Sequence, residues 1–169
     1  MKYSKIIFMI LLLSMITLSA CGKMTPEPNL SLAYQDSKLD IIYYGNYNND
    51  KEEDIEAQLK DYMIGKKFEE LPIIKYGDDL LIKRLNFTTE EYIIYDYILD
   101  NKCNIVSQFT SEGYIVTTSD EAQSIFKYSN NHSIDEFQNY LIEDKNVHCL
   151  IINCEIDGSK FSFATLVLN

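Results

Sequence analysis

The sequence predicts an α+β domain in which helices alternate with antiparallel β-hairpins. Three features indicate this class: helix-start signals followed by apolar side chains at helical spacing, β-branched and aromatic runs that end at turn residues, and an Asp-Gly pair between two such runs near the C-terminus. The chain has 169 residues, of which 46% are hydrophobic and 24% charged, as is typical of a folded globular protein. This length suits one domain, which we expect to span residues 31–169.

The first expected elements are a strand and a helix. Residues 38–44 are rich in β-branched and aromatic side chains and precede Gly45, which predicts a strand that ends there. Asp50 and Glu53 form a helix-start signature, and apolar side chains at helical spacing follow them. A helix is therefore predicted over residues 50–64.

A second helix is predicted from Thr88 to about Asp100. Thr88 and Glu91 form a capping box, the pattern in which two side chains bind the unpaired amide groups of a helix start. Phe87 and Tyr92 would supply the apolar contact that often accompanies such a start.

The remaining elements are predicted from turn and capping residues. They are a hairpin of 72–76 and 80–86, a hairpin of 103–109 and 113–118, a short helix over 119–128, a helix over 133–144, and a hairpin of 147–156 and 160–168. The Asp157-Gly158 pair of the last hairpin is the strongest turn signal in the chain. The helix starts at Thr88 and Ser133 are similar and each precedes a Cys-containing strand, which suggests a repeated helix–strand–strand unit.

The N-terminal segment has the character of a secretory signal. Lys2 and Lys5 precede an apolar run, Ile6–Leu18, which as a helix would span about 20 Å. This length is short of the about 30 Å hydrocarbon core of a membrane, so a cleaved signal peptide is favoured over a membrane-spanning helix.

Leu18-Ser19-Ala20-Cys21 follows this run and resembles the lipobox of bacterial lipoproteins, whose pattern is Leu-[Ser/Ala/Thr]-[Ala/Gly]-Cys. The resemblance implies that residues 1–20 are removed as a signal peptide and that the Cys21 sulfur carries a diacylglycerol. It also implies that the protein is held on the outer side of a bacterial cytoplasmic membrane or in the periplasm. Residues 21–30 contain two prolines and no apolar periodicity, which predicts an extended tether between the lipid and the domain.

The chain is strongly acidic. Its net charge is −11, and the loss of residues 1–20, which contain two lysines and no acidic residue, makes it −13. Because nucleic acids are bound through Lys and Arg, this balance argues against DNA or RNA as a partner. It favours a basic protein or peptide, whereas contact with the membrane would come from the lipid on Cys21.

Three cysteines remain after the anchor, and they allow three interpretations. Cys103, Cys149 and Cys154 are buried structural thiols, or Cys103 forms a disulfide with one of the other two, or the thiols are reactive or metal-binding. His148 and Cys149 are neighbours on a predicted strand and point to opposite faces, so they cannot form a catalytic pair. We expect a partly exposed His148, no metal and no cofactor, because no ligand spacing is present.

Tyrosine is abundant, with 13 in the chain. Tyr43, Tyr44 and Tyr47 lie close together in sequence near an acidic segment, and Asp96 lies among further tyrosines of the predicted second helix. Aromatic rings beside carboxylates suit cationic peptides, so these four residues are the candidate binding residues. The competing interpretation places the tyrosine rings in the core of a small domain that has no Trp.

These observations together predict a membrane-anchored, non-catalytic module that binds a protein or peptide. Three alternatives remain. The chain is an immunity-type lipoprotein that sequesters a cationic antimicrobial peptide, or a small envelope enzyme that depends on a thiol or on carboxylates, or a structural subunit of an envelope complex.

Overall fold

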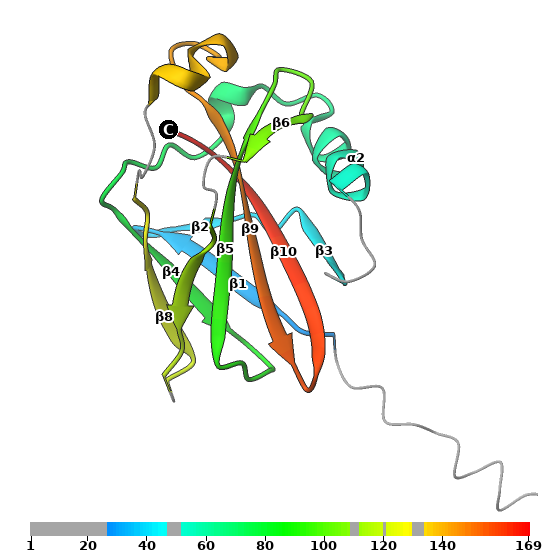
Figure 1. The fold of residues 1–169 in the computed structure, drawn as a ribbon, viewed down its shortest axis with the longest axis vertical. Coiled ribbons are helices and arrows are strands. Elements are labelled where there is room, and N and C mark those ends of the chain that lie inside the picture. Colours follow the sequence, from blue (N-terminus) through cyan, green and yellow to red (C-terminus); the bar gives the residue numbers. More distant parts are fainter. Residues whose placement is uncertain (1–26, 47–51, 109–111, 120, 130–133) are drawn as a thin grey trace, which may run out of the picture.

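The computed structural model of the chain describes residues 27–46, 52–108, 112–119, 121–129 and 134–169. These residues form two antiparallel β-sheets, one α-helix and two short 3₁₀ helices (Figure 1). The elements are, in chain order, β1 (Leu30–Tyr34), β2 (Ser37–Leu39), β3 (Tyr43–Asn46), α2 (Glu52–Met63), η1 (Phe68–Glu70), β4 (Asp79–Arg84), β5 (Glu91–Leu99), β6 (Ile105–Gln108), β7 (Tyr114–Thr117), β8 (Gln123–Lys127), η2 (Ile134–Tyr140), β9 (Val147–Ile156) and β10 (Ser159–Leu168). Every element of the described fold therefore lies at or after Leu30.

The fold is mostly β-sheet, so the predicted alternation of helices and hairpins is wrong. Strands account for 48% of the structure and helical residues for 15%. The segment predicted as the second helix, 88–100, contains β5; residues 119–128 contain β8; and residues 133–144 contain the 3₁₀ helix η2. The suggested helix–strand–strand repeat is also wrong, because neither of its α-helices is present in the described residues.

Two predicted elements are present, and the others are rearranged. The helix expected over 50–64 is α2, and the last hairpin is formed by β9 and β10. Residues 38–44 contribute to two strands, β2 and β3, instead of one. Residues 72–76 do not form a hairpin with β4, and Ile73 makes only a single bridge, to Leu168. Strands β6 and β7 both pair with β5 and not with each other.

Pairing with distant strands explains why the second predicted helix is a strand. The segment is rich in Ile and Tyr, which favour strands, and β5 lies between β9 on one side and β6 and β7 on the other. Alternate side chains, including Tyr92 and Ile94, are buried in the core between the sheets. Glu91, predicted to form a capping box with Thr88, is instead the first residue of β5, and its carbonyl accepts a hydrogen bond from the Thr89 hydroxyl at 3.0 Å.

The sheets have the strand orders β2-β1-β4-β8 and β3-β10-β9-β5-β6, with β7 pairing with β5 beside β6. Strands β9 and β10 form a hairpin that is paired from Ser159–Ile156 to Leu168–Val147 and runs the length of the molecule (Figure 1). Asp157 and Gly158 have φ angles of 50° and 78°, the left-handed geometry that a two-residue hairpin turn requires.

Both faces of the β9–β10 hairpin are buried, and each face packs in a separate core cluster. Leu150 lies in the cluster between the two sheets, together with Ile82 of the four-stranded sheet. Ile151, which points the other way, lies in the cluster under α2, together with Leu59 of that helix. The six-stranded sheet is thus the middle layer of the molecule, with the four-stranded sheet on one side and α2 on the other.

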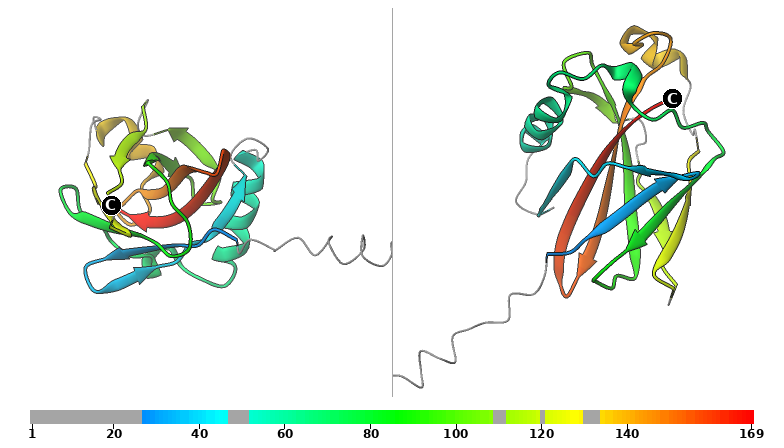
Figure 2. Two further views of the ribbon diagram at one scale, coloured as in Figure 1. Left: turned by 90° about the horizontal axis from the view of Figure 1, so that it is seen from below. Right: turned by 180° about the vertical axis from the view of Figure 1, so that it is seen from behind.

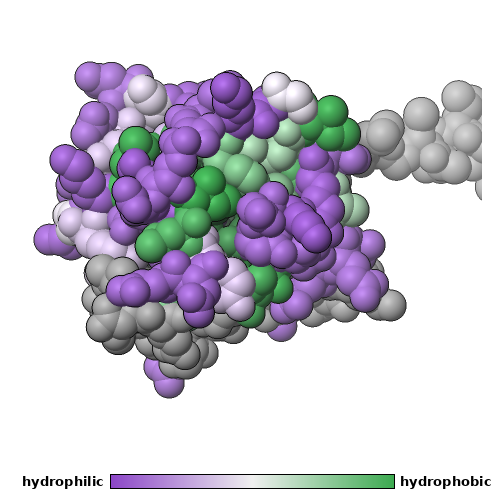
Figure 3. Space-filling view, turned by 90° about the horizontal axis from the view of Figure 1, so that it is seen from above, coloured by the Kyte–Doolittle hydropathy of each residue, from purple (hydrophilic) through white to green (hydrophobic). Residues whose placement is uncertain are grey.

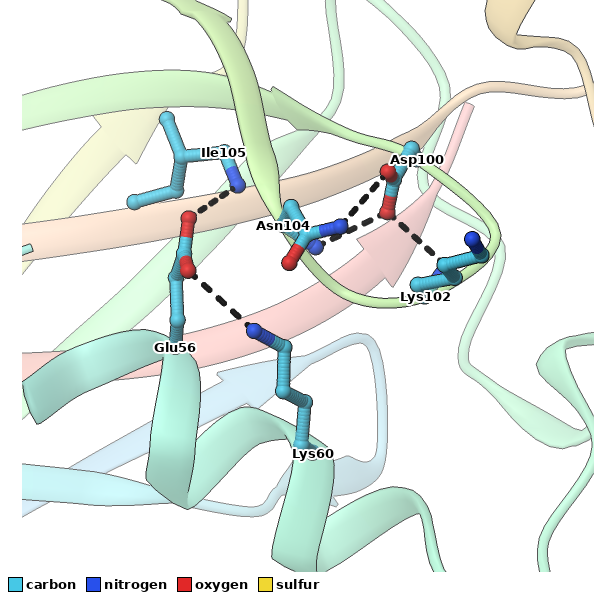
Figure 4. Close-up of polar contacts among 6 residues, drawn as sticks. All are labelled: Glu56, Lys60, Asp100, Lys102, Asn104 and Ile105. Atoms are coloured by element: carbon cyan, nitrogen blue, oxygen red, sulfur yellow. Dashed lines mark hydrogen bonds and ion pairs between the residues drawn. The ribbon is translucent and has the colours of Figure 1, made fainter. Parts of the chain in front are cut away.

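Helix α2 is tied to the loop between β5 and β6 (Figure 4). The Glu56 carboxylate accepts a hydrogen bond from the Ile105 amide at 2.7 Å and forms an ion pair with Lys60 Nζ at 3.2 Å. One carboxylate therefore fixes the helix against the start of β6.

Asp100 organises the same loop. Its carboxylate accepts hydrogen bonds from the Lys102 amide at 2.8 Å, the Asn104 amide at 2.9 Å and the Asn104 side chain at 2.7 Å (Figure 4). Burial acts to raise the pKa of Asp100, but the hydrogen bonds from Asn104 and Lys102 outweigh it and hold the pKa below the ordinary 3.8.

The two ends of the molecule carry different elements (Figures 1 and 2). At the proximal end, the described chain begins at Glu27 near the tip of the β9–β10 hairpin. At the opposite, distal end lie η1, η2 and the C-terminus. Among the described residues no helix is long and apolar enough to cross a membrane. Residues 1–20 and Cys21, and with them the predicted signal and lipid anchor, lie outside the described residues.

Candidate functional site

The candidate binding residues predicted from the sequence do not form one exposed face. Tyr43 is 2% exposed in the cluster under α2, and Asp96 is fully buried between the sheets. Tyr44 is half-buried and stacks on Phe161, with ring centroids 5.9 Å apart. Tyr47 lies outside the described residues. Tyr43 of β3 and Tyr92 of β5 are buried in the core clusters. Their burial supports the competing interpretation, in which the tyrosine rings belong to the core.

Asp96 belongs to a buried polar network with Tyr128 and His148. The Tyr128 hydroxyl donates to Asp96 Oδ2 at 3.0 Å, and His148 Nδ1 lies 2.8 Å from Asp96 Oδ1 and 3.0 Å from the Tyr128 hydroxyl. Burial and the charge of Asp96 raise the pKa of Tyr128 well above 10, so the phenol remains a donor. Both carboxylate oxygens are bonded, which makes this a structural network and not an open site.

The expectation that His148 is partly exposed is wrong, because the residue is fully buried. The prediction assumed that β9 has one solvent-facing side. In the structure β9 is an inner strand with the four-stranded sheet over the face that carries His148, so this imidazole packs edge-on against the Tyr128 ring with 6.0 Å between centroids.

Cys103, Cys149 and Cys154 are all free and buried. Burial raises the pKa of each thiol, to about 12 for Cys154, and the charge of Asp100 adds to the effect at Cys103. Thiols with raised pKa are protonated at neutral pH and are poor nucleophiles. The geometry therefore matches the interpretation as structural thiols, and no pair of them forms the disulfide that the sequence allowed.

A concave surface, the outer groove, lies at the proximal end on the face of the six-stranded sheet that α2 leaves open. It has a volume of about 640 Å³, and the charged side chains that line it are Glu90, Glu91, Glu155, Asp157 and Lys160. The floor includes Ile93 and the buried Asn153, which accepts a hydrogen bond from the Ser162 hydroxyl at 2.7 Å. The groove is therefore acidic at its rim, with apolar and amide groups below.

A second cavity, the proximal pocket, opens between the ends of the two sheets and has a volume of about 840 Å³. Its aromatic lining is Tyr44 and Phe161 of the six-stranded sheet and Phe87 of the loop between β4 and β5, and the carboxylates of Glu27 and Asp157 also line it. Arg84, at the end of β4, also lines it and is only 8% exposed.

Sequence reasoning missed Arg84, although two signals pointed to it. It is the only arginine in the chain, and it follows Leu80 and Ile82 at the alternating spacing of the inward face of a strand. A charged residue at the third inward position of a strand is unusual, since Arg is rarely buried without a partner.

The distal end carries an apolar band (Figure 3). Phe68, Ile73, Ile142 and Leu168 surround a shallow cavity of about 80 Å³ there, and Ile73 is 48% exposed. Glu69, Glu143 and Lys145 complete the lining of this cavity.

No protein-family model, no curated protein and no solved structure matches the chain. The candidate sites therefore rest on the geometry of the chain itself. In the part of the chain that the structure describes, no group of three or more His, Cys, Asp or Glu side chains is arranged to hold a metal ion.

Proposed function

We propose that the protein is a lipid-anchored, extracytoplasmic, non-catalytic binding protein whose outer groove takes a basic peptide or a basic segment of a protein. The observation that carries this proposal is the outer groove, where four carboxylates and one lysine border a cavity of about 640 Å³. Opposite charges across such a surface steer association and give specificity. The net charge of −13 expected for the mature chain acts in the same direction at longer range.

The position of the groove is consistent with a ligand that arrives at the membrane. Asp157 and Gly158, at the hairpin tip, line the groove, and this tip lies at the end where the tether enters the fold. Cys21 precedes Glu27 by six residues, an extended length of about 20 Å. A lipid on Cys21 would hold the groove close to the membrane surface, where a membrane-active cationic peptide accumulates. This favours the immunity-type form of the proposal.

The buried thiols and the buried His148 support a non-catalytic role over a thiol-dependent enzyme. Each cysteine is buried with a raised pKa, and the imidazole that is next to Cys149 in sequence lies inside the Asp96 network. A catalytic thiol needs the opposite environment, in which the thiolate is stabilised and accessible.

The proposal is tested with residues 22–169, which contain every described element, and a synthetic amphipathic peptide of Lys and Leu. Binding is measured calorimetrically at several salt concentrations. Replacing Glu90, Glu91 and Glu155 together by Gln should weaken binding by about 10-fold or more, because each exposed pair contributes up to about 1 kcal/mol.

The matched control replaces three exposed carboxylates far from the groove. The variant E52Q/E53Q/E69Q changes the net charge by the same amount but alters α2 and η1. It should retain the wild-type affinity. An equal loss in both variants would show that only net charge acts, and the absence of any binding would overturn the proposal.

A second candidate is a structural subunit of an envelope complex, favoured by the apolar band at the distal end (Figure 3). Here the partner would cover Ile73, which is 48% exposed. The variant I73D should then lower the abundance of the protein in cells without lowering the stability of the isolated domain. Unchanged abundance would exclude this role for the band.

A further inference from the structure

The proximal pocket combines an aromatic wall with one buried cation. Phe161 stacks on Tyr44, and Phe87 stacks on Phe163 with ring centroids 6.2 Å apart. Phe163 is fully buried behind this wall, whereas Tyr44, Phe87 and Phe161 line the cavity of about 840 Å³. A cavity of this volume can hold a small ligand, and its aromatic side offers that ligand an apolar surface.

Arg84 reaches this pocket from the end of β4. Its Nη2 donates to the Ser119 carbonyl at 2.6 Å, whereas Nη1 is buried and has no hydrogen-bond partner among the described residues. Tyr92 lies beside the guanidinium: burial raises the pKa of this phenol to about 12, although the charge of Arg84 and hydrogen bonding to its side chain act to lower it. The guanidinium is therefore held by Ser119 and Tyr92, and Nη1 is a donor that the described residues leave unused.

The charge of Arg84 is also uncompensated among the described residues. No ion pair joins Arg84 to a carboxylate of these residues. Glu27 and Asp157 line the same pocket, and the charge of Glu27 adds to burial in raising the pKa of Tyr44. Both carboxylates are exposed, however, and neither forms an ion pair with Arg84. Arginine stays charged in proteins, and a buried charge without a partner is strongly destabilising. An anion in the pocket would satisfy both the charge and the open donor.

We infer that the proximal pocket binds an anionic amphiphile: one carboxylate or phosphate accepts from the Arg84 guanidinium, and the apolar body packs against Tyr44, Phe87 and Phe161. Guanidinium binds both oxyanions through its planar set of donors. This pocket adjoins the outer groove, with which it shares Thr88 and Asp157, but its ligand has the opposite charge to the basic peptide proposed there.

The place of the pocket suggests where the ligand comes from, a point that rests on the proposed anchor. Asn86 holds the start of the described chain at the pocket: its side chain accepts from the Asn29 amide and donates to the Glu27 carbonyl, both at 2.7 Å. The pocket is thus within about 20 Å of extended chain from Cys21. A single-chain amphiphile that leaves a membrane would meet it directly.

The test uses decanoate, decanol and decylammonium as probes of residues 22–169 by calorimetry. Decanoate should bind best, because only its head group suits Arg84. The variant R84M should bind decanoate about 10- to 100-fold more weakly, as expected for the loss of a charged hydrogen bond, while its affinity for decanol stays unchanged. Equal decanoate affinity in R84M and wild type, or no binding by either, would overturn the inference.

Two further variants separate a ligand site from an internal ion pair. R84K keeps the charge and loses the planar donor set, so it should bind decanoate with intermediate affinity and provides a folded comparison if R84M does not fold. E27Q/D120N neutralises Glu27, which lines the pocket, and Asp120, which follows Ser119 in the sequence and lies outside the described residues. This variant should bind decanoate as well as wild type or better. If it instead lowers stability as a broken buried ion pair would, Arg84 has an internal partner and the inference fails.

The source of the ligand is distinguished with vesicles of phosphatidylglycerol. If the pocket takes a lipid head group from an intact membrane, R84M should reduce sedimentation of the domain with these vesicles. If it takes a free amphiphile, sedimentation is the same for both proteins and only decanoate binding differs. Loss of neither in R84M would contradict the assignment of Arg84.

Discussion

Two charged groups lie between the same two sheets, and their surroundings are opposite. Asp96 is fully buried, and each of its carboxylate oxygens is hydrogen-bonded, one to Tyr128 and one to His148. Arg84 is 8% exposed, lines a cavity and has a guanidinium nitrogen with no partner. Burial alone therefore does not distinguish a structural charge from a binding one. The distinction is whether the fold itself supplies the partners.

The largest loss of stability is expected when Asp96 is replaced. The variant D96A leaves His148 and Tyr128 buried with an empty polar site and should lower the free energy of unfolding by about 3–5 kcal/mol. Y128F, which removes one bond of the same network, should lose only about 1 kcal/mol. Denaturant unfolding measures both. A loss under about 1 kcal/mol for D96A would contradict a structural role for this network.

Asp100 is expected to make an intermediate contribution to stability, and this contribution depends on pH. Its carboxylate accepts three hydrogen bonds in the β5–β6 loop, and the variant D100N should lower the free energy of unfolding by about 1 kcal/mol at pH 7. The pKa of Asp100 is lowered from 3.8, so its stabilising contribution is complete above pH 3.8 and is lost as the pH falls through the lower folded value. The difference between the two proteins should therefore narrow below pH 3.8; a constant difference would mean that charge is not involved.

The exposed ion pair of α2 is expected to contribute less to stability than Asp100 does. Lys60 is 42% exposed and forms its pair with Glu56 one helical turn away. Since water and salt screen such pairs, K60A should change the free energy of unfolding by no more than about 0.5 kcal/mol. A larger loss in denaturant unfolding would indicate that Lys60 also positions Glu56 for its bond to Ile105.

The smallest change in stability is expected at Arg84. The variant R84M loses the bond to Ser119 but also removes a buried donor and charge that the fold leaves without a partner. These effects oppose each other, so the free energy of unfolding without ligand should stay within about 0.5 kcal/mol of wild type. A loss as large as that of D96A would place Arg84 with the structural charges.

The parts of the fold that local signals determine were predicted from the sequence. Asp157-Gly158 imposes a tight turn whatever surrounds it, and α2 has a start signature, an apolar stripe and a following glycine. The capping box at Thr88 is equally local, but the pairing of β5 with β9 over eight residue pairs outweighs it. Non-local pairing leaves no such local signature in a single sequence.

The site residues depended on this non-local part of the fold. Whether His148 and Asp96 face solvent depends on the second sheet that covers β9 and β5, and no nearby residue indicates that sheet. The interpretation of the three cysteines as buried thiols agrees with the structure, and it could be made from the sequence because it needs only an apolar strand. Arg84 has a detectable signal in the sequence, because it alternates with Leu80 and Ile82 on β4. That Arg84 lines a cavity can be seen only in the folded structure.

The most direct test of the contrast between Arg84 and Asp96 is the effect of decanoate on unfolding. A ligand that binds only the native state raises the free energy of unfolding in proportion to the logarithm of its concentration above the Kd. At a concentration that saturates all three proteins, decanoate should stabilise wild type and Y128F equally and should stabilise R84M by about 1.4–2.7 kcal/mol less, the equivalent of its 10- to 100-fold weaker binding. If decanoate stabilises R84M as much as wild type, Arg84 is not the binding charge and the account is contradicted.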